Sequence, residues 1–209
     1  MLPVSDGTLD SRERVHYDEL EFTMKYVSSR GRPSDSGRLF VASLEQAVLA
    51  FLCAHADRSF YGAEVAGEAG LSRGGVNRVL RELARAGLAE AEDRGRMRFY
   101  RARLADPRVR SFKTLLNIDA LSPLIDRLSR LALRVVLFGS AAEGTNIPDS
   151  DVDLLVVTNS PDRARKIVSS GGDALQAVIV TPVGLADLER DNPVFAAELK
   201  RGIELWKES

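Results

Sequence analysis

VVLFGSAAEGTNIPDSDVDLLVV, residues 135–157, is the stretch of this chain that decides its fold. It contains two continuous apolar runs rich in valine, residues 135–138 and 152–157. Such runs are typical of strands that are covered on both faces of a sheet. Between them, Gly139-Ser140 makes a turn into a short helix that begins with the letters AAEG. The stretch therefore predicts two buried strands joined by a turn, a helix and a loop.

The turn and the start of the second strand carry the residues that could bind a ligand or take part in a reaction. Glycine at 139 lets the backbone approach a bulky anion, and the first N–H groups of the helix and the Ser140 hydroxyl can donate to phosphate oxygens. Asp151 and Asp153 open the second strand two residues apart, so their carboxylates project from one face. Such a pair can hold Mg²⁺, which prefers oxygen and bridges to nucleotide phosphates. The alternative interpretation is that the two aspartates merely make the start of the strand acidic and bind no ligand.

These residues give the predicted site. Gly139 and Ser140 are expected to bind a nucleoside triphosphate, with ATP as the expected nucleotide. Asp151 and Asp153 are expected to bind Mg²⁺ and to act in catalysis, since two metal ions would stabilise the attacking and leaving oxygens of an in-line displacement. A P-loop site is excluded because the chain has no glycine-rich loop ending in Gly-Lys-Ser/Thr.

The remaining C-terminal sequence continues the alternation of helices and strands. The predicted elements are a helix that begins at Ser122-Pro123, a helix from Ser160-Pro161 to Gly171-Gly172, a strand at 175–181, and helices near 183–190 and 194–201. This order predicts an α/β (α+β) domain over residues 121–209.

The pattern of Gly139-Ser140, ten further residues and Asp151-x-Asp153 resembles the minimal nucleotidyltransferase domain of the DNA-polymerase-beta-like superfamily. The last stretch, PVFAAELKRGIELWKES, resembles the closing helix of that family. The resemblance implies a mixed sheet, Mg²⁺, and transfer of a nucleoside monophosphate from a triphosphate to a hydroxyl. Minimal domains of this family often serve as antitoxins that modify their toxins, so it also implies a toxin protein as one candidate acceptor.

One position departs from the family. Its active members usually carry a third carboxylate on the next strand, where this chain has Gln176. An amide binds Mg²⁺ weakly and cannot act as a carboxylate base; Asp173 replaces it only if the strand begins elsewhere. Two functions stay open: an enzyme that transfers a nucleotidyl group, or a transcriptional regulator whose degenerate domain senses a nucleotide or only dimerises.

Residues 44–103 predict a second kind of domain. Ser43 and Gln46 have the spacing of a capping box, which predicts that a first helix begins after Ser43. A second, short helix is predicted near 61–69, and a third begins after Ser72 and ends before Gly87. A hairpin over 88–103 completes the order of a winged helix-turn-helix. The stretch LSRGGVNRVLRELARAGL, residues 71–88, resembles the turn and recognition helix of MarR- or ArsR-type regulators.

The charge of the chain is unevenly distributed. Residues 72–103 hold nine arginines against four acidic residues, whereas residues 121–209 hold ten basic and thirteen acidic residues. A basic helix and wing suit the major groove and the phosphate backbone, so double-stranded DNA and a homodimer on paired half-sites are expected. The alternative is a solvated basic face or a protein-docking surface. The predicted DNA-binding residues are Arg73, Asn77, Arg78, Arg81, Arg94, Arg96 and Arg98.

Length and composition set the organisation. The 209 residues suit two small domains, which we place at 44–103 and 121–209, with an N-terminal arm at 1–43 and a helical linker at 104–120. Alternating apolar residues over 20–26 predict one half-buried strand in the arm. The chain has one cysteine, no basic and apolar leader, and no apolar run of about 18 residues, so a cytoplasmic protein without a membrane span is expected.

Overall fold

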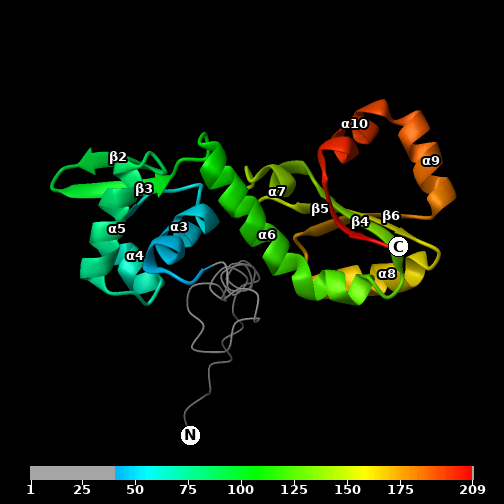
Figure 1. The fold of residues 1–209 in the computed structure, drawn as a ribbon, viewed down its shortest axis with the longest axis horizontal. Coiled ribbons are helices and arrows are strands. Elements are labelled where there is room, and N and C mark those ends of the chain that lie inside the picture. Colours follow the sequence, from blue (N-terminus) through cyan, green and yellow to red (C-terminus); the bar gives the residue numbers. More distant parts are fainter. Residues whose placement is uncertain (1–40, 209) are drawn as a thin grey trace, which may run out of the picture.

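The computed structural model describes residues 41–208, so the predicted strand in the arm lies outside the described residues. Helices and strands alternate along the chain (Figure 1). Their order is α3 (Leu44–Ala54), β1 (Phe60–Tyr61), α4 (Gly62–Glu68), α5 (Arg73–Arg85), β2 (Ala89–Arg94), β3 (Met97–Ala102), α6 (Pro107–Leu128), β4 (Ala132–Phe138), α7 (Gly139–Glu143), β5 (Val152–Thr158), α8 (Pro161–Val168), a 3-10 turn (Ser169–Gly171), β6 (Leu175–Val180), α9 (Pro182–Asp191), α10 (Pro193–Arg201) and β7 (Ile203–Lys207). Within residues 41–208, no helix is both long and apolar enough to cross a membrane.

Helices α3, α4 and α5 and the β2–β3 hairpin form the winged helix-turn-helix. Ser43 caps α3 with the predicted capping box, because its hydroxyl accepts from the Gln46 N–H and the Gln46 side chain accepts from the Ser43 N–H. Ser72 occupies the N-cap position of α5, but its side chain makes no capping hydrogen bond. Gly87 ends α5 at φ 73°, as predicted. The apolar face of α5 packs into a core that includes Val76 and Leu80, both fully buried.

The small sheet of this unit has a strand that the sequence pattern did not predict. Strand β1, two residues long, pairs antiparallel with β3, so the order is β1-β3-β2. Phe60 is buried in the core from this strand, where its ring meets Phe51 edge-on. Two residues are too short to show a period of two.

Helix α6 corrects one prediction. Ser122-Pro123 was expected to begin a helix, yet α6 runs without interruption through Pro123, and the Ser122 hydroxyl donates to the Ile118 carbonyl of the preceding turn. Buried residues at both ends explain the continuity: Val109 belongs to the core of the winged helix-turn-helix, and Leu121 and Leu124 belong to the core beneath the second sheet. Packing on two cores offsets the cost of a proline inside the helix.

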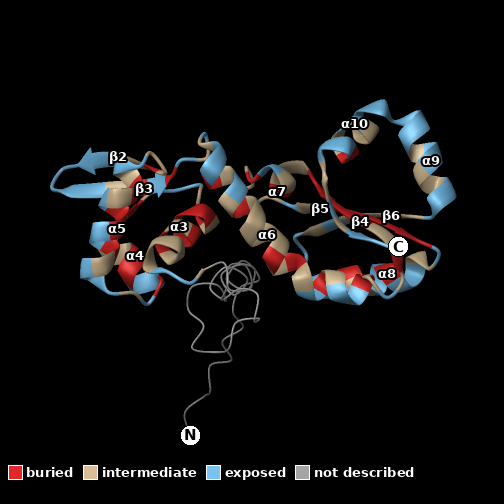
Figure 2. Ribbon diagram, in the orientation of Figure 1, coloured by how far each residue is buried: buried red, intermediate tan, exposed pale blue. Residues whose placement is uncertain are grey.

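The second sheet is mixed, as predicted, with strand order β6-β5-β4-β7. Strand β5 pairs antiparallel with β4 and parallel with β6. Helices α6 and α8 cover one face, and α9 and α10 cover the other (Figure 1). Strands β4 and β5 are buried between these layers (Figure 2), with Leu154 in one core and Leu155 in the other.

The C-terminus corrects a second prediction. The closing stretch is not helical to its end: α10 ends at Arg201, and β7 pairs antiparallel with the free edge of β4. Gly202 lets the chain pass close to β4, because a Cβ there would lie 2.7 Å from a Val136 methyl group. The Arg134–Glu204 ion pair, at 2.7 Å, and the Trp206 Nε1 bond to the Ala132 carbonyl, at 3.1 Å, fix β7 in place. Local sequence periodicity could not predict β7, because these contacts join residues that lie far apart in the sequence.

Candidate functional site

The turn between β4 and α7 brings Gly139 against Asp153. Gly139 adopts φ 67°, a conformation that favours glycine. A Cβ at this position would lie 2.5 Å from the Asp153 carboxylate. In the β4–β5 pair, Asp153 lies opposite Phe138, the residue before the turn. The predicted Gly-Ser and Asp-x-Asp halves therefore meet in space.

The two aspartates lie at the start of β5. Asp151 directly precedes the strand and is exposed, and Asp153 is the second strand residue and is partly buried. The pKa of Asp153 is raised, first by burial and then by the negative charges of Asp151 and Glu198. Two carboxylates that repel each other are a suitable place for a cation.

Two carboxylates fit Mg²⁺ only if a nucleotide completes the coordination. Within residues 41–208, no three acidic, histidine or cysteine side chains form a group that could hold a metal ion by themselves. Mg²⁺ commonly uses one or two carboxylates together with substrate phosphates and water. The donors at Asp151 and Asp153 match that arrangement.

Gln176 lies beside Asp153. The parallel register pairs Asp153 of β5 with Gln176 of β6, so both side chains lie on the same face of the sheet. Gln176 is exposed. The neutral amide therefore lies beside Asp153, at the position where the family resemblance leads us to expect a third carboxylate.

Glu198 is a carboxylate near the site that the sequence analysis missed. It lies on α10, whose Phe195 and Leu199 pack on the sheet face that also carries Asp153. Phe195 meets Phe138 edge-on at 5.5 Å between ring centroids. Glu198 is half-buried, and its charge contributes to the raised pKa of Asp153. Helical spacing places Glu198 beside Phe195 and Leu199, but nothing in the sequence places α10 over this face.

Helix α6 holds the short helix α7, which carries Ser140. Thr114 donates to the Ala142 carbonyl at 3.1 Å, and Asn117 donates to the Ala141 carbonyl at 2.9 Å. Gly144, with φ 67°, lies so close to the Arg110 carbonyl that a Cβ would collide with it. Within the described part of the chain, the Ser140 hydroxyl makes no hydrogen bond, so it is available to a ligand.

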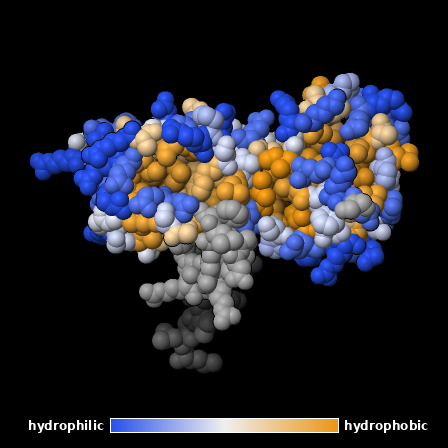
Figure 3. All heavy atoms as spheres, viewed as in Figure 1, coloured by the Kyte–Doolittle hydropathy of each residue, from blue (hydrophilic) through white to orange (hydrophobic). Residues whose placement is uncertain are grey.

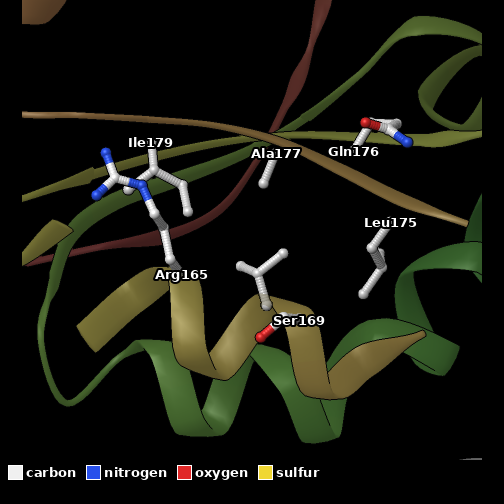
Figure 4. Close-up of a pocket in the computed structure, with 7 residues that line it drawn as sticks. Arg165, Ser169, Leu175, Gln176, Ala177 and Ile179 are labelled. Atoms are coloured by element: carbon white, nitrogen blue, oxygen red, sulfur yellow. The ribbon is translucent and has the colours of Figure 1, made fainter. Parts of the chain in front are cut away.

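A groove of about 450 Å³ lies between α8 and β6, and its lining includes Gln176 (Figure 4). Leu175, Ala177 and Ile179 form its strand side, Arg165 of α8 extends toward it, and Ser169 of the following 3-10 turn lines its other side. Gln176 points to the opposite side of the strand in this view. The groove and the Asp153 site therefore lie on opposite sides of the sheet, and both include Gln176.

The predicted DNA-binding surface lies on α5 and the wing, and Figure 3 shows hydrophilic residues gathered over the end of the molecule that carries β2 and β3. Arg73, Asn77 and Arg81 are exposed and share one face of α5 at intervals of four residues. In residues 41–208, no ion pair involves Arg73, Arg81 or Arg96. These arginines are therefore available to phosphates.

Other predicted DNA contacts are already engaged within the protein. Arg78 pairs with Glu45 and Glu82, each at 2.8 Å. Arg94 pairs with Glu92 at 2.7 Å, and Arg98 lies 3.5 Å from Asp93. Asn77 is exposed, but its side-chain amide lies directly against Gly62 of α4, where a Cβ would collide with it.

Comparison with known proteins addresses the C-terminal half. Residues 121–204 match the family model described as "Nucleotidyltransferase domain". The matched segment contains Gly139, Ser140, Asp151, Asp153 and Gln176. None of the curated proteins compared with the chain matches its sequence.

Three solved structures resemble parts of the chain. A candidate nucleotidyltransferase from Sulfolobus solfataricus is 17% identical, with 47% of this chain and 87% of that chain covered and a TM-score of 0.34. NadR in complex with 4-hydroxyphenylacetate is 12% identical (62% and 85% covered, TM-score 0.34). The homodimeric winged helix-turn-helix domain of a possible ArsR-family regulator from Mycobacterium bovis is 18% identical (58% and 90% covered, TM-score 0.25). With TM-scores this low, these likenesses support no statement about function.

Gly139→Ala is expected to weaken nucleotide binding and to destabilise the protein by about 1–3 kcal/mol, the usual cost of a left-handed conformation in a residue other than glycine. The added methyl group must also displace the Asp153 carboxylate. Gly172→Ala is the matched control, because Gly172 also has a positive φ but has no atom within 4 Å of the Cβ position. Thermal unfolding measures the loss of stability, and calorimetric titration with Mg–ATP measures the loss of affinity. Equal nucleotide affinity in the two variants would contradict the predicted role of Gly139 in nucleotide binding.

Proposed function

We propose that residues 121–208 bind a nucleoside triphosphate with Mg²⁺ and transfer its nucleoside monophosphate to a hydroxyl group. The observation that carries the proposal is the meeting of Gly139 with Asp153 inside the segment that matches the nucleotidyltransferase family. Asp151 and Asp153 would hold the metal ion, and Ser140 and the adjacent backbone N–H groups would orient the phosphates. Mg²⁺ would neutralise the negative charge that develops on the phosphate oxygens.

The transfer requires a bond to form and a bond to break at the α-phosphorus. The acceptor oxygen bonds to this phosphorus as the bond to the pyrophosphate oxygen breaks, and the acceptor loses its proton. Gln176 cannot take that proton. Glu198, whose charge acts on Asp153, is the carboxylate that would take this proton. The family resemblance favours a protein hydroxyl, such as that of a toxin, as the acceptor of the nucleotidyl group.

The proposal is tested by incubating the purified chain with α-labelled nucleoside triphosphates, Mg²⁺ and lysate of the source cells. A labelled macromolecule that is absent without Mg²⁺ and absent with the Ser140→Ala variant is the expected result. Magnesium-dependent nucleotide binding without any labelled product, across all four nucleotides, would contradict transfer and favour a sensing role.

Gln176→Glu is expected to raise Mg²⁺ affinity by roughly tenfold, since it adds a third charge to the face of Asp153. Glu198→Gln is expected to lower any transfer rate while leaving the Mg²⁺ affinity within about twofold, because Glu198 is assigned to the proton and not to the metal. Glu189→Gln, on the exposed surface of α9, is the matched control. Titration with Mg²⁺ and a transfer assay separate the two roles; an unchanged Mg²⁺ affinity in Gln176→Glu would show that position 176 does not face the metal.

A second candidate function is a DNA-binding regulator that responds to nucleotide. The exposed stripe of Arg73 and Arg81 supports DNA binding, and Gln176 supports a site that binds without catalysing. Helix α6 contacts both α3 and α7, so it joins the two units mechanically. A regulator of this kind should change its DNA affinity when Mg–ATP is added, whereas an enzyme with an independent DNA anchor should not.

A further inference from the structure

Strand β6 is an outer strand of the second sheet, and its outer edge has no partner strand within residues 41–208. The Val152 N–H donates to the Ala174 carbonyl at 2.8 Å, so Ala174 faces β5. Because successive residues of a strand alternate in direction, Ala177 and Ile179 direct their N–H and C=O groups away from β5. Such a row of unpaired backbone groups is a template for another strand.

Strand β6 itself carries no charge, proline or bulge of the kind that usually protects an outer strand. Its sequence, LQAVIV, contains no charge and no proline, and its register with β5 is regular. The opposite edge differs: β7 carries Glu204 and Lys207, and its pairing with β4 is shifted between Val135 and Val136. Charges and bulges of this kind discourage pairing at an edge. Strand β6 is therefore the edge at which a further strand can join.

We propose that β6 pairs antiparallel with β6 of a second copy of this chain, about a two-fold axis at Ala177. This register places Ala177 opposite its own counterpart and Leu175 opposite Ile179, so small side chains face small ones and large face large. Residues 174–182 contain no charged side chain, so no like charges face each other. A two-fold contact must be self-complementary in this way.

The groove beside β6 supports a strand as the occupant of this edge. Leu175, Ala177 and Ile179 line it on the strand side, and Arg165 of α8 and Ser169 of the 3-10 turn line it on the helix side (Figure 4). In the proposed dimer the apolar side chains of the partner strand extend this layer. The two four-stranded sheets become one continuous sheet. Because the axis is perpendicular to that sheet, Gln176 of both copies faces the same side.

Two cysteine variants test the register. Residues directly opposite in an antiparallel pair have Cα atoms about 5.5 Å apart, which suits a disulfide. Ala177→Cys is therefore expected to form a covalent dimer on mild oxidation. Leu175→Cys is the matched control, because the two copies of residue 175 would lie about 13 Å apart at ~3.3 Å per residue. Cys53 does not interfere, since it is fully buried and burial raises the pKa of its thiol to about 12.

Analytical ultracentrifugation gives the second readout. The unmodified chain is expected to sediment as a dimer at micromolar concentration, and Ala177→Pro, which removes only an outward N–H, is expected to sediment as a monomer with an unchanged circular dichroism spectrum. A monomeric unmodified chain would overturn the proposal. So would a dimer in which Ala177→Cys fails to cross-link or Leu175→Cys cross-links equally well, because another surface would then join the copies. If Ala177→Pro does not fold, the comparison of Ala177→Cys with Leu175→Cys still tests the proposed pairing.

Discussion

Replacing Asp151 and Asp153 together with asparagine is expected to lower Mg²⁺-dependent ATP affinity by at least about 100-fold. Changes that only support a metal ligand already cost about 10–100-fold in affinity, and this double variant removes both charged ligands. Asparagine keeps the shape of each side chain, so the contact with Gly139 is preserved. Calorimetric titration with Mg–ATP measures the loss.

The same variant should not unfold the protein. Asp151 and Asp153 repel each other, and this repulsion contributes to the raised pKa of Asp153. Removing the two charges is therefore expected to leave the melting temperature unchanged or to raise it slightly. Asp162→Asn, at an exposed position on α8, is the control that changes charge without touching the site. Unchanged nucleotide affinity in a folded double variant would remove Asp151 and Asp153 from the site.

Proton competition gives the site a testable pH dependence. A raised pKa means that a proton competes with Mg²⁺ for Asp153 at a higher pH than for an ordinary aspartate. Metal affinity should therefore decline as the pH falls through this raised value. In Asp151→Asn the decline should move to lower pH, because one source of repulsion is gone.

The central strands and the two halves of the site follow from the sequence because their signals are local. Strands β4 and β5 are continuous apolar runs, and such runs form buried strands with few alternatives. Gly139 and Asp153 lie at the end of one strand and the start of the next, so pairing of the two strands is enough to bring them together.

The elements that the sequence did not predict depend on partners far along the chain. Residues 203–207 form β7 because β4 offers a free edge some 70 residues earlier, and α6 passes through Pro123 because two cores hold it. Glu198 and Asn117 reach the site for the same reason: each lies on a helix whose position is set by tertiary packing. Local periodicity contains no information about such contacts.

Alanine at Arg73 and Arg81 together is expected to weaken low-salt binding to double-stranded DNA by at least tenfold and to flatten its salt dependence. Each phosphate contact contributes about −0.9 to the slope of log affinity against log salt, so losing two contacts should reduce the slope by about 2. Fluorescence anisotropy at two salt concentrations, with random-sequence DNA, measures both quantities. No binding of the unmodified chain at low salt would show that the surface docks a protein instead.

The ion pairs of Arg78 make the same prediction sharper. Arg78 is already neutralised by Glu45 and Glu82, so Arg78→Ala should change the slope by less than 1 and serves as the matched control on the same helix. An exposed ion pair contributes little to stability, so breaking it should leave the fold intact. Glu45→Gln with Glu82→Gln should release the Arg78 guanidinium toward a phosphate and raise DNA affinity. If this variant instead binds DNA no better than the unmodified chain, Arg78 lies outside the DNA-binding surface, and contact with DNA rests on Arg73, Arg81 and the wing alone.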